Sequence, residues 1–231
     1  MIVFAHRANH EGVDKACENT LNATRHCLEQ GWGIETDIRR APDGRFYISH
    51  DPVDLTDNNH ADKFLDLFRR HPKTVIALNV KELGYEDELL RYLGQWDVIA
   101  KGQLFLFDME LLELVPGSTA ALFRRLNPEI HLAARVSDRG EPVERALEIE
   151  SAQIIWLDEF DRLWAKAADI RRLKAAGKTV YAISPEIHGF SLEEMRRRWK
   201  QFHAWGIDGI CTDYSALLAQ GLADGFQEVR L

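Results

Sequence analysis

Short apolar runs alternate with amphipathic segments along the whole chain. The apolar runs predict strands, at Ile2–Ala5, Gly33–Ile38, Phe46–Ser49, Thr74–Val80, Gln103–Phe107, Thr119–Phe123, His131–Val136, Ala152–Leu157, Thr179–Ile183 and Gly209–Cys211. The segments between them predict helices, at Thr20–Gln30, Ala61–Arg70, Tyr85–Leu93, Met109–Leu114, Val143–Glu148, Arg162–Ala175, Leu192–Trp205 and Tyr214–Gln220. Strands that alternate with helices imply a parallel sheet with right-handed crossovers.

This alternation continues over residues 1–231 without a linker, a low-complexity segment or a break in composition. It predicts a single α/β domain, a closed (β/α)₈ TIM barrel rather than a doubly wound sheet. The predicted strands outnumber the eight of such a barrel. The Asp43-Gly44 turn predicts that Phe46–Ser49 forms a small hairpin insertion after the second strand, and we expect one or two other assignments to be wrong.

Length and charge narrow the class of protein. The 231 residues are close to the ~250 that are typical of this barrel, and 45% of them are hydrophobic. The net charge of −8 argues against a nucleic-acid partner, because phosphates would be repelled. Any phosphate site must therefore be locally basic.

Composition also suggests a location. No apolar stretch approaches the ~20 residues of a membrane span, and no signal peptide is recognisable. We expect a cytoplasmic protein without stable membrane insertion. Three scattered cysteines, Cys17, Cys27 and Cys211, fit a reducing compartment.

Polar residues stand at or just past the end of many apolar runs: His6, Asp37, His50, Lys81, Arg135 and Asp158. In (β/α)₈ barrels the chemistry is carried by the carboxyl ends of the strands and the loops that follow them. The spacing therefore predicts a site at that face of the barrel.

Glu35 and Asp37 are the most informative of these polar residues. They are two residues apart in an apolar run, so a strand points both carboxylates to one side. Two like charges side by side are costly unless a cation shares them, and carboxylates suit Mg²⁺ or Ca²⁺. The alternative is a solvated edge strand with two surface acids. Two nearby histidines, His6 and His50, favour general acid/base chemistry on a phosphate ester.

A series of short motifs carries a family resemblance: His6-Arg7, Glu18-Asn19-Thr20, Glu35-Thr36-Asp37, Asp43-Gly44, His50-Asp51, Asn79-Val80-Lys81 and the segment from Gly206 to Tyr214. In this order and spacing they resemble the signature of the glycerophosphodiester phosphodiesterase family. That family lies in the superfamily of phosphatidylinositol-phospholipase-C-like phosphodiesterases. The match is dense over the first third of the chain and weak over residues 95–200.

The resemblance implies metal-dependent hydrolysis of a small phosphodiester in lipid metabolism. It implies His6 and His50 as general acid and base, and Arg7 as a fork that grips phosphate oxygens. It also implies that Glu35, Asp37 and the residue at position 79 bind the cation. The Glu18-Asn19-Thr20 motif is expected to organise the site or to cap the next helix.

Four further residues have two interpretations each. Lys81 and Arg135 are candidate phosphate-binding residues. Trp156 and Asp158 are candidates for the substrate pocket, where the tryptophan would stack on an apolar or sugar-like group. The alternatives are structural ion pairs for Lys81 and for Arg135 with Asp158, and a core position for Trp156.

Two departures from the family pattern affect the expected substrate and cation. Asn79 stands where the family has glutamate, and its amide oxygen can bind Mg²⁺ or Ca²⁺ but adds no charge. The family's Trp-Thr-Val-Asn is replaced by the segment from Tyr181 to Ser184, which is expected near the organic part of the substrate.

Two alternative functions stay open. One is a phospholipase-like lyase that forms a cyclic phosphate, which would need an apolar rim for lipid, whereas the apolar segment Gln103–Phe107 is expected to be a buried strand. The other is a non-catalytic barrel that binds a phosphorylated ligand, favoured by Asn79 and opposed by the histidine pair. The alcohol groups, the metal and the oligomeric state are not determined by the sequence.

Overall fold

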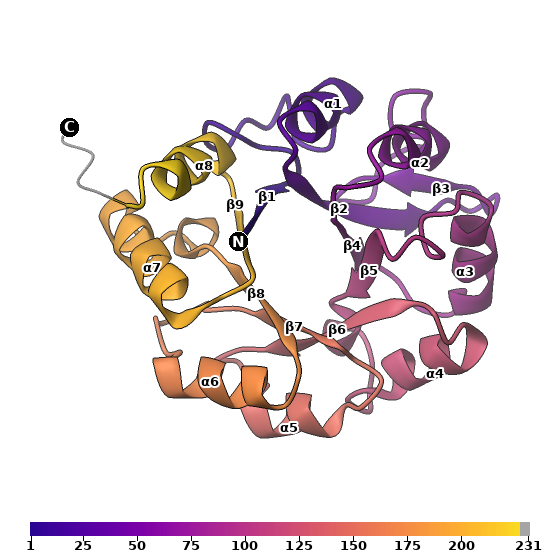
Figure 1. The fold of residues 1–231 in the computed structure, drawn as a ribbon. Coiled ribbons are helices and arrows are strands. Elements are labelled where there is room, and N and C mark those ends of the chain that lie inside the picture. Colours follow the sequence, from indigo (N-terminus) through magenta and orange to yellow (C-terminus); the bar gives the residue numbers. More distant parts are fainter. Residues whose placement is uncertain (227–231) are drawn as a thin grey trace.

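The computed structural model describes residues 1–226, which form a closed barrel of strands surrounded by helices (Figure 1). The strands are β1 (Ile2–His6), β2 (Gly33–Arg40), β3 (Phe46–Ile48), β4 (Ile76–Val80), β5 (Leu104–Phe107), β6 (His131–Val136), β7 (Ile154–Leu157), β8 (Thr179–Ile183) and β9 (Gly209–Thr212). The helices are α1 (Leu21–Glu29), α2 (Ala61–Arg70), α3 (Glu86–Gly94), α4 (Ser118–Leu126), α5 (Val143–Glu148), α6 (Ala167–Ala175), α7 (Leu192–Trp205) and α8 (Ser215–Ala223), with the short 3₁₀ helices η1 (Met109–Leu111) and η2 (Pro185–His188).

Eight parallel strands close the barrel in the order β1-β2-β4-β5-β6-β7-β8-β9, because β9 pairs with β1. The predicted α/β TIM barrel is therefore confirmed. Strand β3 lies outside this ring and pairs antiparallel with β2. It is the hairpin predicted after Asp43-Gly44, where Gly44 has a φ of 91° that favours glycine.

Two predicted elements are wrong and one is too long. The predicted strand Thr119–Phe123 lies inside α4, where Thr119, Ala120 and Phe123 form one buried helical face. Such short apolar runs fit either period. The predicted helix Met109–Leu114 is reduced to η1, because Pro116 and the left-handed Gly117 lead into α4 instead. Helix α6 begins at Ala167 rather than at residue 162.

Alternate residues of each strand point into the barrel and form layers. The lower layer contains an aromatic cluster in which the Phe4 ring is fully buried, 4.9 Å from that of Tyr181 between centroids. Gly33 leaves room for this ring, since a Cβ there would lie 2.7 Å from Phe4. The inward-pointing residues closer to the carboxyl ends of the strands, such as His6 on β1, are polar. The polar layer therefore rests on a packed floor.

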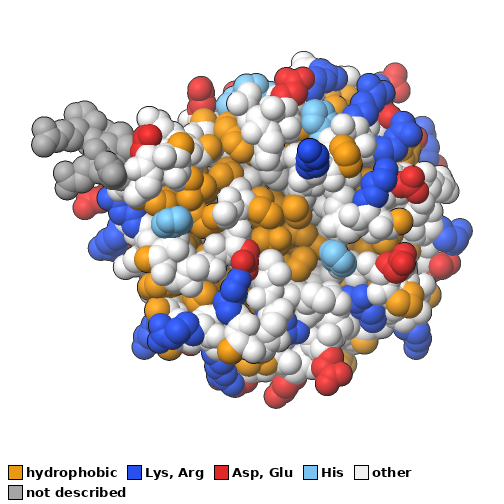
Figure 2. Space-filling model, viewed as in Figure 1, with side chains coloured by type: hydrophobic (Ala, Val, Ile, Leu, Met, Phe, Trp, Pro, Cys, Tyr) orange, Lys and Arg blue, Asp and Glu red, His pale blue; other side chains and the backbone are white. Residues whose placement is uncertain are grey.

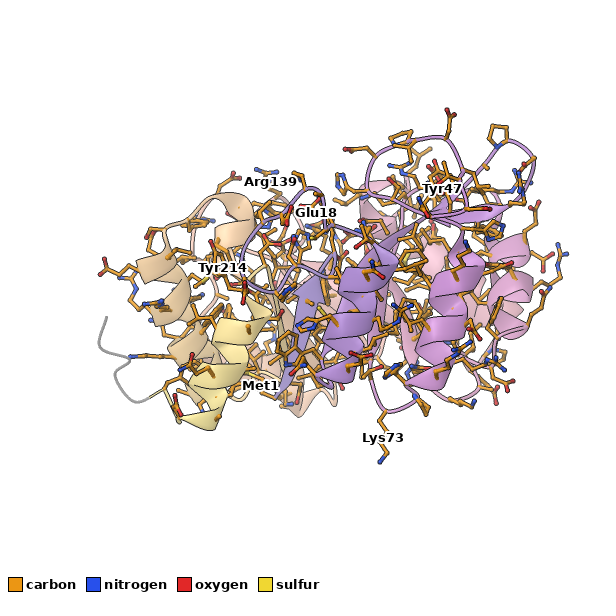
Figure 3. The ribbon with its side chains drawn as sticks, turned by 90° about the horizontal axis from the view of Figure 1, so that it is seen from above. Met1, Glu18, Tyr47, Lys73, Arg139 and Tyr214 are labelled. Carbon is orange, nitrogen blue, oxygen red and sulfur yellow. The ribbon has the colours of Figure 1, made fainter. Side chains whose placement is uncertain are left out.

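The two ends of the barrel are separated in Figure 3, where Glu18 and Arg139 lie at one end and Met1 and Lys73 at the other. Glu18 and Arg139 belong to loops that follow the carboxyl ends of β1 and β6. These loops mark the end at which a site is expected.

Figure 2 shows the barrel along its axis, with apolar side chains gathered near the centre and both signs of charge interspersed around them. Within residues 1–226, no helix combines the length and the apolar character needed to cross a membrane.

Candidate functional site

A cavity of about 190 Å³ lies among the carboxyl ends of the barrel strands. All the site residues predicted from the sequence line it: His6, Arg7, Glu35, Asp37, His50, Asn79, Lys81, Arg135, Trp156 and Asp158. It is also lined by residues that sequence reasoning missed as site residues: Phe107, Asp108, Leu111, Phe160, Ile183, Ile187 and His188.

We distinguish two sides of this cavity. The lining residues from His6 to Lys81 form the β1–β4 side, and those from Phe107 to His188 form the β5–β8 side.

Two buried carboxylates, Glu35 and Asp37, lie at the centre of the β1–β4 side. Burial and repulsion from Asp37 raise the pKa of Glu35 to about 7. The Oδ1 atom of Asp37 is buried and has no hydrogen-bond partner among the described residues. Lys81 Nζ lies 3.4 Å from this oxygen, and Arg7 Nε lies 3.6 Å from Oδ2. Two acids and two cations thus share one wall of the cavity.

His6 is held by the end of β9. Its Nδ1 lies 2.7 Å from Asp213 Oδ1. An ionised carboxylate only accepts, so Nδ1 carries the hydrogen and Nε2 faces Glu35, 3.9 Å from Oε2. Burial alone would lower the pKa of His6, but the bond to Asp213 and the charge of Glu35 outweigh it and raise that pKa.

His50 comes from the loop after β3 and is more exposed. Its Nδ1 lies 2.8 Å from Asp51 Oδ1, and its backbone carbonyl accepts two hydrogen bonds from Arg39. Burial and the charge of Arg7 lower the pKa of His50. The two histidines therefore face one cavity from different environments.

The Glu18-Asn19-Thr20 motif both caps a helix and supports the site. Thr20 is the N-cap of α1, where its Oγ1 accepts from the Ala23 N–H. Asn19 Nδ2 donates to Asp37 Oδ2 at 3.1 Å, and Glu18 accepts from Arg7 Nη1 at 3.4 Å.

On the β5–β8 side, Arg135 lies between two carboxylates. Its guanidinium donates to Asp108 and, at 2.5 Å, to Asp158 Oδ2. The structural ion pair considered for Arg135 and Asp158 is thus present. Trp156 is 1% exposed and lies 4.4 Å from Phe107 between ring centroids, so it forms part of the floor.

Asn79 connects the two sides. Its Nδ2 donates to Asp108 Oδ2 at 2.9 Å. This bond fixes the orientation of the amide and leaves its oxygen without a donor among residues 1–226. Asp108 has a φ of 68°, a left-handed conformation that aspartate tolerates better than most residues.

The chemistry of these donors suits a hard divalent cation. Glu35 and Asp37 offer carboxylates, one with an unpartnered buried oxygen, and Asn79 offers an amide oxygen. Over residues 1–226, no group of three or more His, Cys, Asp or Glu side chains is placed to hold a metal ion. The residues fit such a cation with two carboxylates and one neutral ligand.

Apolar side chains of η1 and of the loop that follows it are exposed. Leu111, Leu112, Leu114 and Val115 are 57%, 42%, 100% and 64% exposed. Leu111 also lines the cavity. Most of these residues fall in the predicted helix Met109–Leu114, of which only η1 is formed.

A parallel barrel whose strand ends bring histidines, acids and cations to one cavity has the architecture of a TIM-barrel enzyme. Solved glycerophosphodiester phosphodiesterases share its fold. One from Parabacteroides distasonis has a TM-score of 0.73 at 16% identity, with 99% of this chain and 88% of that chain covered. One from Thermotoga maritima has a TM-score of 0.63 at 18% identity, with 95% and 97% covered.

A phosphodiesterase from Oleispira antarctica, solved in complex with the product sn-glycerol-3-phosphate, has a TM-score of 0.66 at 18% identity and covers 96% of this chain and 97% of that chain. No family model and no curated protein matches the chain. The fold that the resemblance implied is thus confirmed, at sequence identities of 16–18%.

The same barrel also occurs with other activities. The tryptophan synthase alpha chain of Legionella pneumophila has a TM-score of 0.51 with this chain at 14% identity. Because one fold serves many reactions, function has to be argued from the site.

Proposed function

We propose that this protein hydrolyses a small glycerophosphodiester-like phosphodiester with the help of Mg²⁺ or Ca²⁺. The observation that carries the proposal is the convergence of two histidines, two carboxylates and two cationic side chains on one cavity. The fold shared with glycerophosphodiester phosphodiesterases supports it. So does the size of the cavity, about 190 Å³, since a cavity of roughly 150 Å³ can hold benzene.

The β1–β4 side would carry out the reaction. Arg7 and Lys81 bind phosphate oxygens by charge and hydrogen bonds. One histidine removes a proton from the attacking water and the other protonates the leaving alkoxide. Asp213 keeps the ring of His6 turned so that Nε2 faces the reacting groups.

The cation would be held by Glu35, Asp37 and the amide oxygen of Asn79, and when bound it supplies positive charge beside the phosphate. Arg135 was a candidate phosphate ligand, but its guanidinium is bonded to Asp108 and Asp158. We therefore assign Arg135 and Asp158 to the wall of the substrate pocket and Trp156 to its floor.

The test is a screen of glycerophosphodiesters with Mg²⁺, Ca²⁺ or Mn²⁺, each with and without a chelator. We expect turnover of at least one diester, which chelation stops. Activity that survives exhaustive chelation would contradict the metal role. A protein that binds sn-glycerol 3-phosphate but cleaves no diester would be the non-catalytic binder considered above.

One observation favours a second candidate, the lyase that forms a cyclic phosphate from a lipid. The apolar rim that such an enzyme needs would start at Leu111, which lines the cavity and is 57% exposed, beside the exposed Leu112. Phosphorus NMR of the products separates the two reactions, because attack by a neighbouring hydroxyl gives a cyclic phosphate and attack by water gives a phosphomonoester.

A further inference from the structure

Three histidines line the cavity, and each is hydrogen-bonded to an aspartate. Two of these pairs, His6 with Asp213 and His50 with Asp51, involve the histidines already described. The third is His188, the last residue of η2, which belongs to none of the motifs recognised in the sequence. It lies on the β5–β8 side.

His188 is held in place from two directions. Its Nε2 lies 2.5 Å from Asp158 Oδ1, and its ring lies 4.4 Å from that of Phe160 between centroids. The other oxygen of Asp158 accepts from Arg135, so this carboxylate cannot turn away without losing a second bond. The position of the imidazole is therefore defined before any ligand arrives.

This arrangement determines what His188 offers to a ligand. Asp158 is 3% exposed and paired with Arg135, so its ionised carboxylate only accepts hydrogen bonds. The hydrogen of this bond must then lie on Nε2 of His188, and whenever the ring is uncharged its Nδ1 is an acceptor. The side chain is 19% exposed, and Nδ1 has no partner among the described residues.

The other groups on this wall sharpen the assignment. Ile183, Ile187 and Leu111 line the cavity with it and offer no hydrogen bonds through their side chains. Nδ1 of His188 is thus the ring nitrogen left for a ligand, in a part of the cavity that these apolar side chains share with the Arg135–Asp158 pair; β8, which His188 follows, is separated from β1 and Arg7 by β9. The matching chemical group is a hydroxyl donor.

We propose that His188 is a specificity-determining residue, whose Nδ1 accepts a hydrogen bond from a hydroxyl of the alcohol part of the phosphodiester. This inference rests on the proposed function and deepens it. The phosphate lies against the β1–β4 side, and a small hydroxylated alcohol extends to the β5–β8 side.

The test uses His188→Gln, because glutamine can place its amide nitrogen near Nε2 and keep the bond to Asp158 while it has no atom at Nδ1. Binding of sn-glycerol 3-phosphate and of inorganic phosphate is measured by calorimetry. A hydrogen bond of ~1 kcal/mol corresponds to about fivefold in affinity. We expect glycerol phosphate to bind about fivefold more weakly to the variant, and inorganic phosphate to bind equally to both proteins.

The matched control is His203→Gln on the exposed face of α7, which should change neither affinity. Unchanged binding of glycerol phosphate to His188→Gln would overturn the proposal. Equal weakening of both ligands would also overturn it, because it would indicate a general disturbance of the site. So would failure of the wild type to bind glycerol phosphate more tightly than phosphate.

Hydrolysis of bis-para-nitrophenyl phosphate tests the proposed function separately, because neither alcohol of this diester has a further hydroxyl. We expect the wild type to cleave it, which tests the hydrolytic function without reference to His188. If the wild type cleaves no diester but the selective effect on glycerol phosphate appears, the hydrolytic function fails while the role of His188 in ligand recognition stands.

Discussion

The two sides of the cavity hold similar residue types in very different states. On the β1–β4 side the charges are close but incompletely bonded: Lys81 lies 3.4 Å from an Asp37 oxygen that has no hydrogen bond, and Arg7 Nε also has no partner among residues 1–226. On the β5–β8 side Arg135 donates through both Nη atoms, to Asp108 and to Asp158, although its Nε also lacks a partner among the described residues. The β1–β4 side therefore keeps charged atoms available to bind a ligand. On the β5–β8 side most of the hydrogen bonds of Arg135 are made to neighbouring carboxylates of the protein.

This difference separates chemistry from support. A group that binds substrate must exchange its partners at low cost, which loosely paired charges near water can do. A buried ion-pair network with satisfied hydrogen bonds holds its geometry instead, and breaking it is costly. We therefore expect variants of the β1–β4 side to lose rate, and variants of the β5–β8 side to lose stability or selectivity.

The largest effect is expected for Arg135→Met, which tests the supporting role of the β5–β8 side. It would leave Asp108 and Asp158 buried without their cation, which should lower the free energy of unfolding by ~3–5 kcal/mol. Urea denaturation followed by circular dichroism measures this.

The control is Arg139→Met, where the ion pair with Asp161 is exposed and little change is expected. If Arg135→Met is as stable as the wild type but loses phosphate affinity, the original interpretation of Arg135 as a phosphate ligand is correct and our comparison is wrong.

The next effect concerns the chemistry assigned to the β1–β4 side. His6→Ala and His50→Ala should each lower kcat by ~10²-fold or more, the usual contribution of a general acid or base. The free energy of unfolding should change little, because both residues stand at or just after the end of a strand, at the mouth of the barrel. Steady-state kinetics with the best diester from the screen measures the rate, and His203→Ala serves as the control. Near-native rates in either variant would reassign the acid/base pair.

The β1–β4 side could be predicted because its information is local in the sequence. Glu35 and Asp37 share a strand face through period-two alternation, and His6-Arg7 directly follows an apolar run. The barrel itself followed from the alternation of strands and helices. Where an apolar run was short, as at Thr119–Phe123, helix and strand had the same signal and the prediction was wrong.

The β5–β8 side could not be predicted in the same way, because its residues are single positions on separate strands. Asp108 follows β5 in a left-handed conformation, and His188 ends a short 3₁₀ helix after β8. No spacing connects them, and closure of the barrel alone brings them to one cavity. The available signal was weak: polar residues at the ends of apolar runs, which had already indicated Arg135 and Asp158.

A smaller effect should appear where the two sides meet, at Asn79. Glutamate here would add a charge beside Glu35 and Asp37, but it would also face Asp108, whose Oδ2 lies 2.9 Å from Asn79 Nδ2. Asn79→Glu combined with Asp108→Asn removes that repulsion. We expect the double variant to bind Mn²⁺ about tenfold more tightly than the wild type, and Asn79→Glu alone to gain less.

Electron paramagnetic resonance of free Mn²⁺ measures this affinity without reference to activity. Asp108→Asn alone is the control, since it adds no carboxylate at position 79. Unchanged affinity in both glutamate variants would mean that residue 79 does not bind the cation.

The smallest effect is a pH-dependent one at Glu110, on η1 behind the β5–β8 wall. Its Oε1 accepts from the Arg135 backbone N–H at 2.9 Å, while its Oε2 is buried without a partner among residues 1–226. Burial raises the pKa of Glu110 from 4.5 to about 7. Between these values the unfolded chain releases this proton and the folded one keeps it, so its contribution to stability is present below pH 4.5 and is lost as the pH rises through 7.

Glutamine keeps the accepting oxygen and cannot ionise. The Tm of Glu110→Gln relative to the wild type should therefore rise between about pH 5 and pH 8, as thermal melts would show. A difference in Tm that is constant with pH would mean that this carboxyl is already ionised in the fold, and that the β5–β8 wall admits more water than its closed network implies.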